Sequence, residues 1–315
     1  MPLSTPRRFR FGIQLQAQRT TWPEYIAAVK VVEDLGFDTV WNFEHMLPFS
    51  GDPNDSCFET LTTLTAMATQ TQRIRIGTLV NGVLYRDPAT LAKSAAMIDI
   101  ISNGRLEFSL GGAWAEREFH AYGLPFPSFA ERAARLDEAL HIVKALWTQA
   151  RTSYVGRYYR LTDAPLEPKP VQKPHPPIMV GGNGRSTLRI AARHADVWNG
   201  VATPEKCAEL IAILHQECAS IGRDPADLEL SAHPNMAIAR DRDAAVARAR
   251  AAERMHGLSS DETSSPWLLG TPAEIRSTIQ RYRDAGITHL TIGISPPFDL
   301  DGLRLFADEV IPAFR

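Results

Sequence analysis

A cluster of glycines between an apolar run and a segment with helical spacing is the first candidate for chemistry in this chain. Residues 178–180 have the composition of a short strand, and Gly181, Gly182, Asn183 and Gly184 separate it from a helix-like segment near Arg185. Glycines at such a junction let backbone N–H groups approach an anion, and a helix N-terminus adds partial positive charge. Arg185 could add a bidentate contact. The pattern predicts a cradle for a cofactor phosphate; a tight turn that only requires positive φ is the alternative.

The motifs of several other site classes do not occur in the sequence. The glycine spacing is not G-x-G-x-x-G with an acidic residue about 20 residues later, and no Lys-Ser/Thr pair follows the glycines, so neither common nucleotide-binding motif is present. The histidines and cysteines lack H-x-x-x-H and C-x-x-C spacing, so we expect no metal site. There is also no G-x-S-x-G nucleophile elbow of the kind that hydrolases use.

A second group of candidates is acidic, imidazole and indole side chains that follow two further apolar runs. Glu44 and His45 follow residues 38–43, where they could act as an acid/base pair or contact a flat ring. Trp114 could wall such a pocket, or belong to the core. Glu116 and Glu118 are two positions apart and cannot share one helical face, so at most one of them should point into a site.

The elements that must position these residues alternate between strand and helix along the whole chain. Strands are expected at residues 9–14, 38–43, 74–79, 106–110, 178–181, 196–199, 228–239 and 287–294, each followed by a helical pattern. We therefore predict one (β/α)₈ barrel domain over residues 1–315, with residues 150–177 as an inserted hairpin and proline-rich segment. A doubly wound sheet is the rival fold, but it usually carries its phosphate glycines after the first strand.

In a barrel the loops after the carboxyl ends of the strands converge on one face, which would bring all these candidates together. The composition, 44% hydrophobic and 22% charged, is that of an ordinary globular protein. The 315 residues carry a formal net charge of only -2, which gives no electrostatic argument for binding nucleic acid or an anionic membrane. No apolar stretch approaches the length of a membrane span, and the first ten residues lack the apolar core of a signal peptide. Three cysteines are too few for a disulfide framework, so we expect thiols and a cytoplasmic location.

Several motifs, taken in order, make the chain resemble the bacterial luciferase-like flavin and deazaflavin oxidoreductases. They are Leu35-Gly36-Phe37-Asp38-Thr39-Val40-Trp41 leading to Glu44-His45, Arg75-Ile76-Gly77-Thr78-Leu79-Val80, Tyr85-Arg86-Asp87-Pro88, Ser102-Asn103-Gly104-Arg105, Gly111-Gly112-Ala113-Trp114 with Glu118, Pro177 to Gly184, and Gly270-Thr271-Pro272-Ala273-Glu274-Ile275. The resemblance covers nearly the whole chain.

The resemblance implies a luciferase-like (β/α)₈ barrel that holds a flavin-type ring at the carboxyl ends of its strands, and a homodimer. It favours coenzyme F-420, a deazaflavin that transfers hydride, and leaves FMN with O₂, as in the monooxygenases, as the alternative. Val80, Asn81 and Gly82, with a non-proline cis peptide among them, are expected to back the ring. The phosphate is expected at Gly181 to Arg185. Glu44 stands where deazaflavin dehydrogenases of this family often carry Asp.

The predicted reaction is hydride transfer between F-420 and a small organic substrate, which is reduced. His45 would orient the cofactor or stabilise charge on it, Glu118, or else Glu116, would exchange the proton, and Trp114 would pack beside the site. Two other classes stay open, a non-catalytic flavin-binding protein and a sugar-phosphate isomerase or aldolase. The latter would need a lysine or paired carboxylates at strand ends, whereas the lysines near the site fall on helices or in the insertion.

Overall fold

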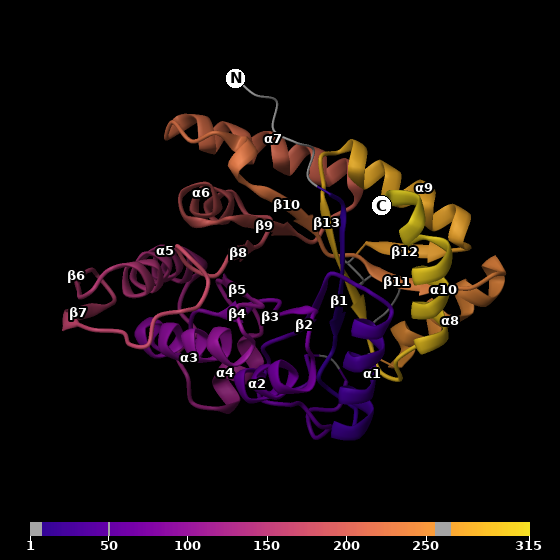
Figure 1. The fold of residues 1–315 in the computed structure, drawn as a ribbon, viewed down its shortest axis with the longest axis horizontal. Helices are drawn as coiled ribbons and strands as arrows, with labels where there is room; N and C mark the ends of the chain where they lie inside the picture. Colours follow the sequence, from indigo (N-terminus) through magenta and orange to yellow (C-terminus); the bar gives the residue numbers. More distant parts are fainter. Residues whose placement is uncertain (1–7, 50, 256–265) are drawn as a thin grey trace.

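The protein folds around a closed barrel of parallel strands (Figure 1). The computed structural model describes residues 8–49, 51–255 and 266–315. In order around the barrel the strands are β1 (Arg10–Leu15), β2 (Thr39–Asn42), β3 (Arg75–Thr78), β5 (Leu106–Gly111), β8 (Ile178–Gly181), β9 (Val197–Gly200), β10 (Glu229–Ala232) and β13 (His289–Ile294). Pairing of β13 with β1 closes the ring. The predicted (β/α)₈ barrel is confirmed, and the doubly wound sheet is wrong.

Helices cover the barrel because each presents an apolar stripe to strands that are buried on both faces. They are α1 (Trp22–Asp34), α2 (Thr60–Gln70), α3 (Pro88–Ile101), α5 (Phe129–Thr148), α6 (Arg185–His194), α7 (Pro204–Ser220), α8 (Arg242–Met255), α9 (Pro272–Asp284) and α10 (Leu300–Glu309), with short turns η1 (Pro225–Asp227) and η2 (Ile311–Phe314). Thr21 and Thr271 each begin a helix through a capping box with the glutamate three residues later, which satisfies N–H groups that the first turn leaves free.

The predicted insertion is present as a hairpin on the outside of the barrel. Strands β6 (Thr152–Val155) and β7 (Arg160–Ala164) pair antiparallel, and residues 165–177 return the chain to β8. The hairpin lies at the end of α5, on the edge of the molecule (Figure 1).

The expected long strand at residues 228–239 is wrong. It is two strands, β10 and β11 (Asn235–Ile238), separated at His233-Pro234, because proline has no N–H to donate to a ladder. β11 leaves the barrel and pairs in parallel with β12 (Trp267–Gly270), a strand that we did not expect. The sequence also predicts a polar loop with Ser and Asp residues at 257–266, and all of it except Pro266 lies outside the described residues.

Charged side chains fill the amino-terminal end of the barrel, opposite to the candidate site. Arg10 pairs with Glu107 and Glu229, and Arg75 also pairs with Glu107. His289, which is fully buried, lies 3.2 Å from the hydroxyl of Thr39 through its Nε2. The side chains therefore close this end with a network of paired charges.

Candidate functional site

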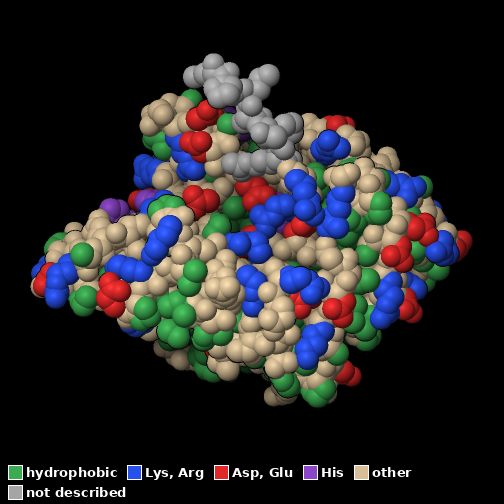
Figure 2. Space-filling view, viewed as in Figure 1, with side chains coloured by type: hydrophobic (Ala, Val, Ile, Leu, Met, Phe, Trp, Pro, Cys, Tyr) green, Lys and Arg blue, Asp and Glu red, His purple; other side chains and the backbone are tan. Residues whose placement is uncertain are grey.

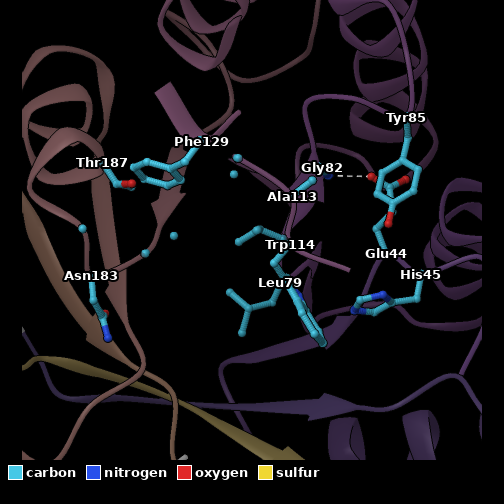
Figure 3. A pocket seen from close by; sticks show the side chains of 16 residues that line it. Glu44, His45, Leu79, Gly82, Tyr85, Ala113, Trp114, Phe129, Asn183 and Thr187 are labelled. Atoms are coloured by element: carbon cyan, nitrogen blue, oxygen red, sulfur yellow. Dashed lines mark hydrogen bonds between the residues drawn. The ribbon is translucent and has the colours of Figure 1, made fainter. Parts of the chain in front are cut away.

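A cavity of about 300 Å³ opens at the carboxyl ends of β2, β3, β5 and β8. Its lining includes most of the residues predicted to form the site: Glu44, His45, Val80, Gly82, Trp114, Gly181, Gly182, Asn183 and Gly184. In Figure 3, Asn183 and Thr187 lie on one side of the cavity, and Glu44, His45 and Tyr85 lie on the other. Its volume is at the lower end of the range for small-molecule sites.

The glycine cluster forms the turn from β8 to α6. Gly182 has φ +137°, a conformation that side chains rarely adopt, and a Cβ there would lie 3.1 Å from Cγ2 of Thr187. Gly184 is the N-cap residue of α6 and has no side chain to occupy that helix end. The free N–H groups of the first turn of α6 therefore face the cavity near Gly182, Gly184 and Thr187, an arrangement that suits an anion.

The two polar side chains of this loop do not point into the cavity as donors. Asn183 holds the loop after β9, since its carboxamide accepts from the N–H of Val201 at 3.1 Å and donates to the Val201 carbonyl at 2.8 Å. The guanidinium of Arg185 lies 3.2 Å from Glu217 on α7 and does not line the cavity. Nε of Arg185 faces this carboxylate, 32 residues later in the chain, and the contact from Arg185 to a phosphate stays a prediction.

The segment after β3 forms the floor of the cavity. The non-proline cis peptide joins Leu79 to Val80, one bond before the expected stretch, because β3 ends at Thr78 and the bulge begins there. Val80 fits against Gly111 and Gly181, where a Cβ would lie 2.7 Å and 2.9 Å from its methyl groups. Asn81 is buried and donates to the carbonyl of Ser109, so it supports the floor from behind without lining the cavity.

His45 and Glu118 form the central polar contact of the site. Nδ1 of His45 lies 2.7 Å from a carboxylate oxygen of Glu118. Nε2, the other imidazole nitrogen, does not contact Glu118. Glu118 also accepts from the hydroxyl of Tyr85 and the backbone N–H groups of Met46 and Leu47. Burial opposes ionisation of Glu118, but these hydrogen bonds hold its pKa below the ordinary value. Glu118 is therefore an anion that fixes the imidazole.

Glu44 is turned away from His45 toward the chain after β3. One of its oxygens accepts from the N–H of Gly82 at 2.6 Å, which Figure 3 marks with a dashed line, and the other pairs with Arg86. Burial raises the pKa of Glu44, against the opposing attraction of Arg86. Glu44 and His45 are adjacent in sequence, but they belong to two separate networks.

The short helix after Trp114 shows which of Glu116 and Glu118 faces the site. Trp114 is 64% exposed and its ring lies edge-on to His45, with centroids 5.3 Å apart, so it forms an outer wall of the cavity. In helix α4 (Glu116–Ala121) the side chain of Glu116 is 60% exposed, whereas that of Glu118 is 2% exposed. As expected, only one of the two faces the site.

Six lining residues of the cavity were not among the predicted site residues: Leu79, Tyr85, Gly111, Gly112, Ala113 and Thr187. Tyr85 binds Glu118 and stacks on Phe119 at 4.6 Å; Thr187 and Phe129 line the side of the glycine turn. The sequence places Tyr85 three residues after Gly82, in a loop that the barrel brings to the site, which is the one cue that was available. An apolar pocket wall is expected from the sequence at five aromatic residues, Tyr122, Phe126, Phe129, Tyr158 and Tyr159, and of these five Phe129, the first residue of α5, lines the cavity.

The described residues offer neither a metal site nor a membrane span. Within residues 8–49, 51–255 and 266–315, no cluster of three His, Cys, Asp or Glu side chains is arranged to hold a metal ion. No helix in that part of the chain is long and apolar enough to cross a membrane. Cys57, Cys207 and Cys218 are free thiols.

Comparison with known proteins gives relatives over almost the whole chain. The family described as luciferase-like monooxygenase matches residues 1–263. A protein of Amycolatopsis mediterranei (strain U-32), named F420-dependent glucose-6-phosphate dehydrogenase, is 28% identical over 311 residues, which span 90% of this chain and 92% of that protein. The F420-dependent hydroxymycolic acid dehydrogenase of Mycobacterium tuberculosis (strain ATCC 25618 / H37Rv) is 31% identical over 228 residues, 72% of this chain and 62% of that protein.

Solved structures share the fold. An F420-dependent secondary alcohol dehydrogenase, in complex with an F420-acetone adduct, superposes with a TM-score of 0.86 at 22% identity, over 98% of this chain and all of that one. The coenzyme F420-dependent tetrahydromethanopterin reductase from Methanopyrus kandleri gives a TM-score of 0.82, also at 22% identity, over 98% of this chain and all of that one.

Proposed function

The chain belongs to the luciferase-like monooxygenase family, and we propose that it is an F420-dependent oxidoreductase that transfers hydride between the deazaflavin and a small organic substrate, in the direction of substrate reduction. The observation that carries the proposal is the pair formed by His45 and Glu118 beside a cavity that ends in a glycine turn. The names of the relatives support the choice of F420, since dehydrogenases that use this coenzyme span this chain at 28% identity.

The residues around the cavity fit a flat ring that carries a phosphate. Gly182 and Gly184 keep the start of α6 free of side chains, so the N–H groups there and the hydroxyl of Thr187 would hold the phosphate. Leu79 and Val80 give the ring an apolar floor at the opposite side of the cavity. When bound, a deazaflavin supplies a carbon centre that gives or takes hydride and does not activate O₂ as a reduced flavin does.

His45 is the residue that we assign to the proton. Hydride transfer to a carbonyl leaves an alkoxide that must be protonated, and a general acid within hydrogen-bond reach commonly contributes about 10²- to 10⁴-fold to the rate. Glu118 is a poor acid because its pKa is lowered and four donors already contact it. Glu118 therefore positions Nδ1 of His45 and stabilises the imidazolium, while Nε2 delivers the proton to the substrate. This assignment revises the predicted roles of the two residues.

The expected homodimer and cytoplasmic location remain predictions. One surface suits a second copy of the chain: α2 contains no charged residue, and Met97 and Ile101 on the adjacent α3 are 41% and 40% exposed. Figure 2 shows hydrophobic side chains gathered at the lower left, where Figure 1 places α3. Exposed apolar surface of this kind is typical of protein contacts.

The reaction is tested with F420 that carries deuterium at C5 in its reduced form. We expect the label to appear at carbon in the product, with transfer to one face only, and the His45→Ala variant to lose at least about 100-fold in turnover. Deuterium that enters the product only from solvent would contradict hydride transfer. Oxygen consumption with reduced FMN would move the protein to the monooxygenase alternative, and binding of F420 without turnover of any alcohol or ketone would favour a non-catalytic protein.

A further inference from the structure

A second cavity, of about 390 Å³, lies between α8 and the loop that follows β13. One wall is the face of α8 that carries Ala251, Ala252 and Met255, which recur at helical spacing. Phe298 belongs to the opposite wall, and Met236 of β11 belongs to the floor. We call this cavity the α8 groove. Apolar side chains without charge make up most of these surfaces, so its chemistry suits a hydrocarbon.

The charged residues of the α8 groove are paired with each other at one end. Arg248 binds Asp299 across the groove and also donates to the carbonyl of Ile238 at 2.8 Å. Both charged groups therefore already have partners, and the guanidinium is not free to bind an anionic ligand. A sugar phosphate would have to compete with Asp299 for the single arginine, whereas an alkyl chain would only need to displace water.

The α8 groove lies on the same face of the barrel as the candidate active site. Gly293, at the groove, pairs in register with Gln14 of β1, and the side chain of Gln14 donates to the carbonyl of Leu79 at the active-site floor. His45 follows β2, which is two strands from β13 across β1. Since neighbouring strands are about 4.8 Å apart, the two sites are separated by about 10 Å of barrel rim, a distance that about eight methylene groups span.

We propose that the α8 groove binds the hydrocarbon chain of a substrate whose carbonyl or hydroxyl group reacts at His45, so that the protein acts on long-chain ketones or secondary alcohols. The inference rests on the proposed function for the reacting end of the substrate. The α8 groove itself is argued only from the residues that line it and from its place beside β1.

The test is calorimetric titration of the F420-bound protein with decan-2-ol, dodecan-2-ol and tetradecan-2-ol, whose chains are long enough to reach the α8 groove. Burial of each further methylene group should tighten binding by about fourfold, so tetradecan-2-ol should bind on the order of 100-fold more tightly than decan-2-ol. Ala251→Glu, which places a carboxylate in the α8 groove at an exposed helical position, should abolish this dependence on chain length. Ala247→Phe, exposed on α8 but outside the lining, is the matched control and should preserve it.

Equal affinity for the three alcohols, or a chain-length dependence that survives Ala251→Glu in a protein with unchanged circular dichroism, would overturn the inference. The binding measurement is independent of turnover. A different outcome is that Ala251→Glu removes the chain-length dependence in a protein that oxidises none of the alcohols and reduces none of the ketones. That combination would support the α8 groove and contradict the proposed function.

Discussion

Four donors converge on the carboxylate of Glu118: the imidazole of His45, the hydroxyl of Tyr85 and two backbone N–H groups. A carboxylate accepts through about four lone-pair sites, so this group is saturated without a proton of its own. The arrangement resembles the orienting carboxylate of a catalytic triad, which fixes the tautomer of a histidine and stays ionised. In the proposed reaction, His45 is therefore oriented by a residue that does not itself line the cavity.

We expect Glu118→Gln to lower kcat by at least about 100-fold while the affinity for F420 stays within about threefold, because the loss concerns the orientation of His45 and not the cofactor surfaces. The amide turns an N–H group toward donors that had an acceptor, so the imidazole loses its fixed tautomer. Steady-state kinetics with calorimetry of F420 binding separates the two effects. Glu116→Gln, two residues away and exposed, is the control; an equal loss there would argue against a specific role for Glu118.

The turn between β8 and α6 is the element that we propose to hold the cofactor phosphate. Its glycines are needed for two reasons that can be separated experimentally, a backbone conformation and an open helix end. Gly182 combines φ +137° with a position at the cavity, whereas Gly222, after α7, has φ +72° and no other residue within 4 Å of the point where a Cβ would lie. Both residues thus have positive φ, but Gly222 is close to the left-handed helical region, whereas Gly182 is far outside it, and their surroundings differ.

Gly182→Ala should weaken F420 binding more than tenfold, since its Cβ lies 3.1 Å from Thr187 and pushes on the turn that would hold the phosphate. Gly222→Ala should cost about 1 kcal/mol of stability through its left-handed backbone and leave F420 affinity unchanged. Fluorescence titration with F420 and chemical denaturation measure the two quantities. If both variants bind F420 like the parent, the turn is not the phosphate cradle.

At the scale of the elements, the helices and strands with a regular hydrophobic periodicity could be predicted from the sequence. An element whose pairing depends on residues distant in the chain could not. The strand β12 is such an element, because it gains its partner only when β11 leaves the barrel beside it, whereas the break at Pro234 in the predicted strand 228–239 has a local cause that the sequence contains. The helix starts at Thr21 and Thr271 were predictable because their caps are local, within three residues.

The candidate site was predictable in its positions and less so in its contacts. Strand ends and glycines placed Glu44, His45 and Glu118 on one face. Which partner each carboxylate takes depends on side chains brought together from separate loops, such as Arg86 for Glu44 and Tyr85 for Glu118. Arg185 shows the same limit, since Glu217 engages it from a neighbouring helix.

At the scale of the whole molecule, a network of charged residues around His289 fills the amino-terminal end of the barrel, opposite to the candidate site. His289 is fully buried, and Arg10, Glu107 and Glu229 face it from β1, β5 and β10. Burial, together with the positive charge of Arg10, lowers the pKa of His289 from 6.5 to about 3, against the opposing attraction of Glu107. The folded protein therefore holds this imidazole neutral under mildly acidic conditions, while the unfolded chain does not.

This difference predicts a loss of stability on acidification that begins near neutrality. The unfolded state takes up a proton at His289 as the pH falls below 6.5, whereas the folded state does so only near pH 3, so the free energy of unfolding decreases as the pH falls through that window. One such histidine costs about 2 kcal/mol between pH 7 and pH 5, before lowered carboxylates such as Glu107 begin to protonate in the unfolded chain. His233, whose pKa is lowered to about 4 by burial, adds in the same direction.

Urea denaturation at several pH values measures how the free energy of unfolding changes with pH. His289→Gln should reduce this slope by about one proton, and His215→Gln, at an exposed position on α7, should not. A slope that His289→Gln leaves unchanged would show that the buried imidazole is charged in the folded barrel.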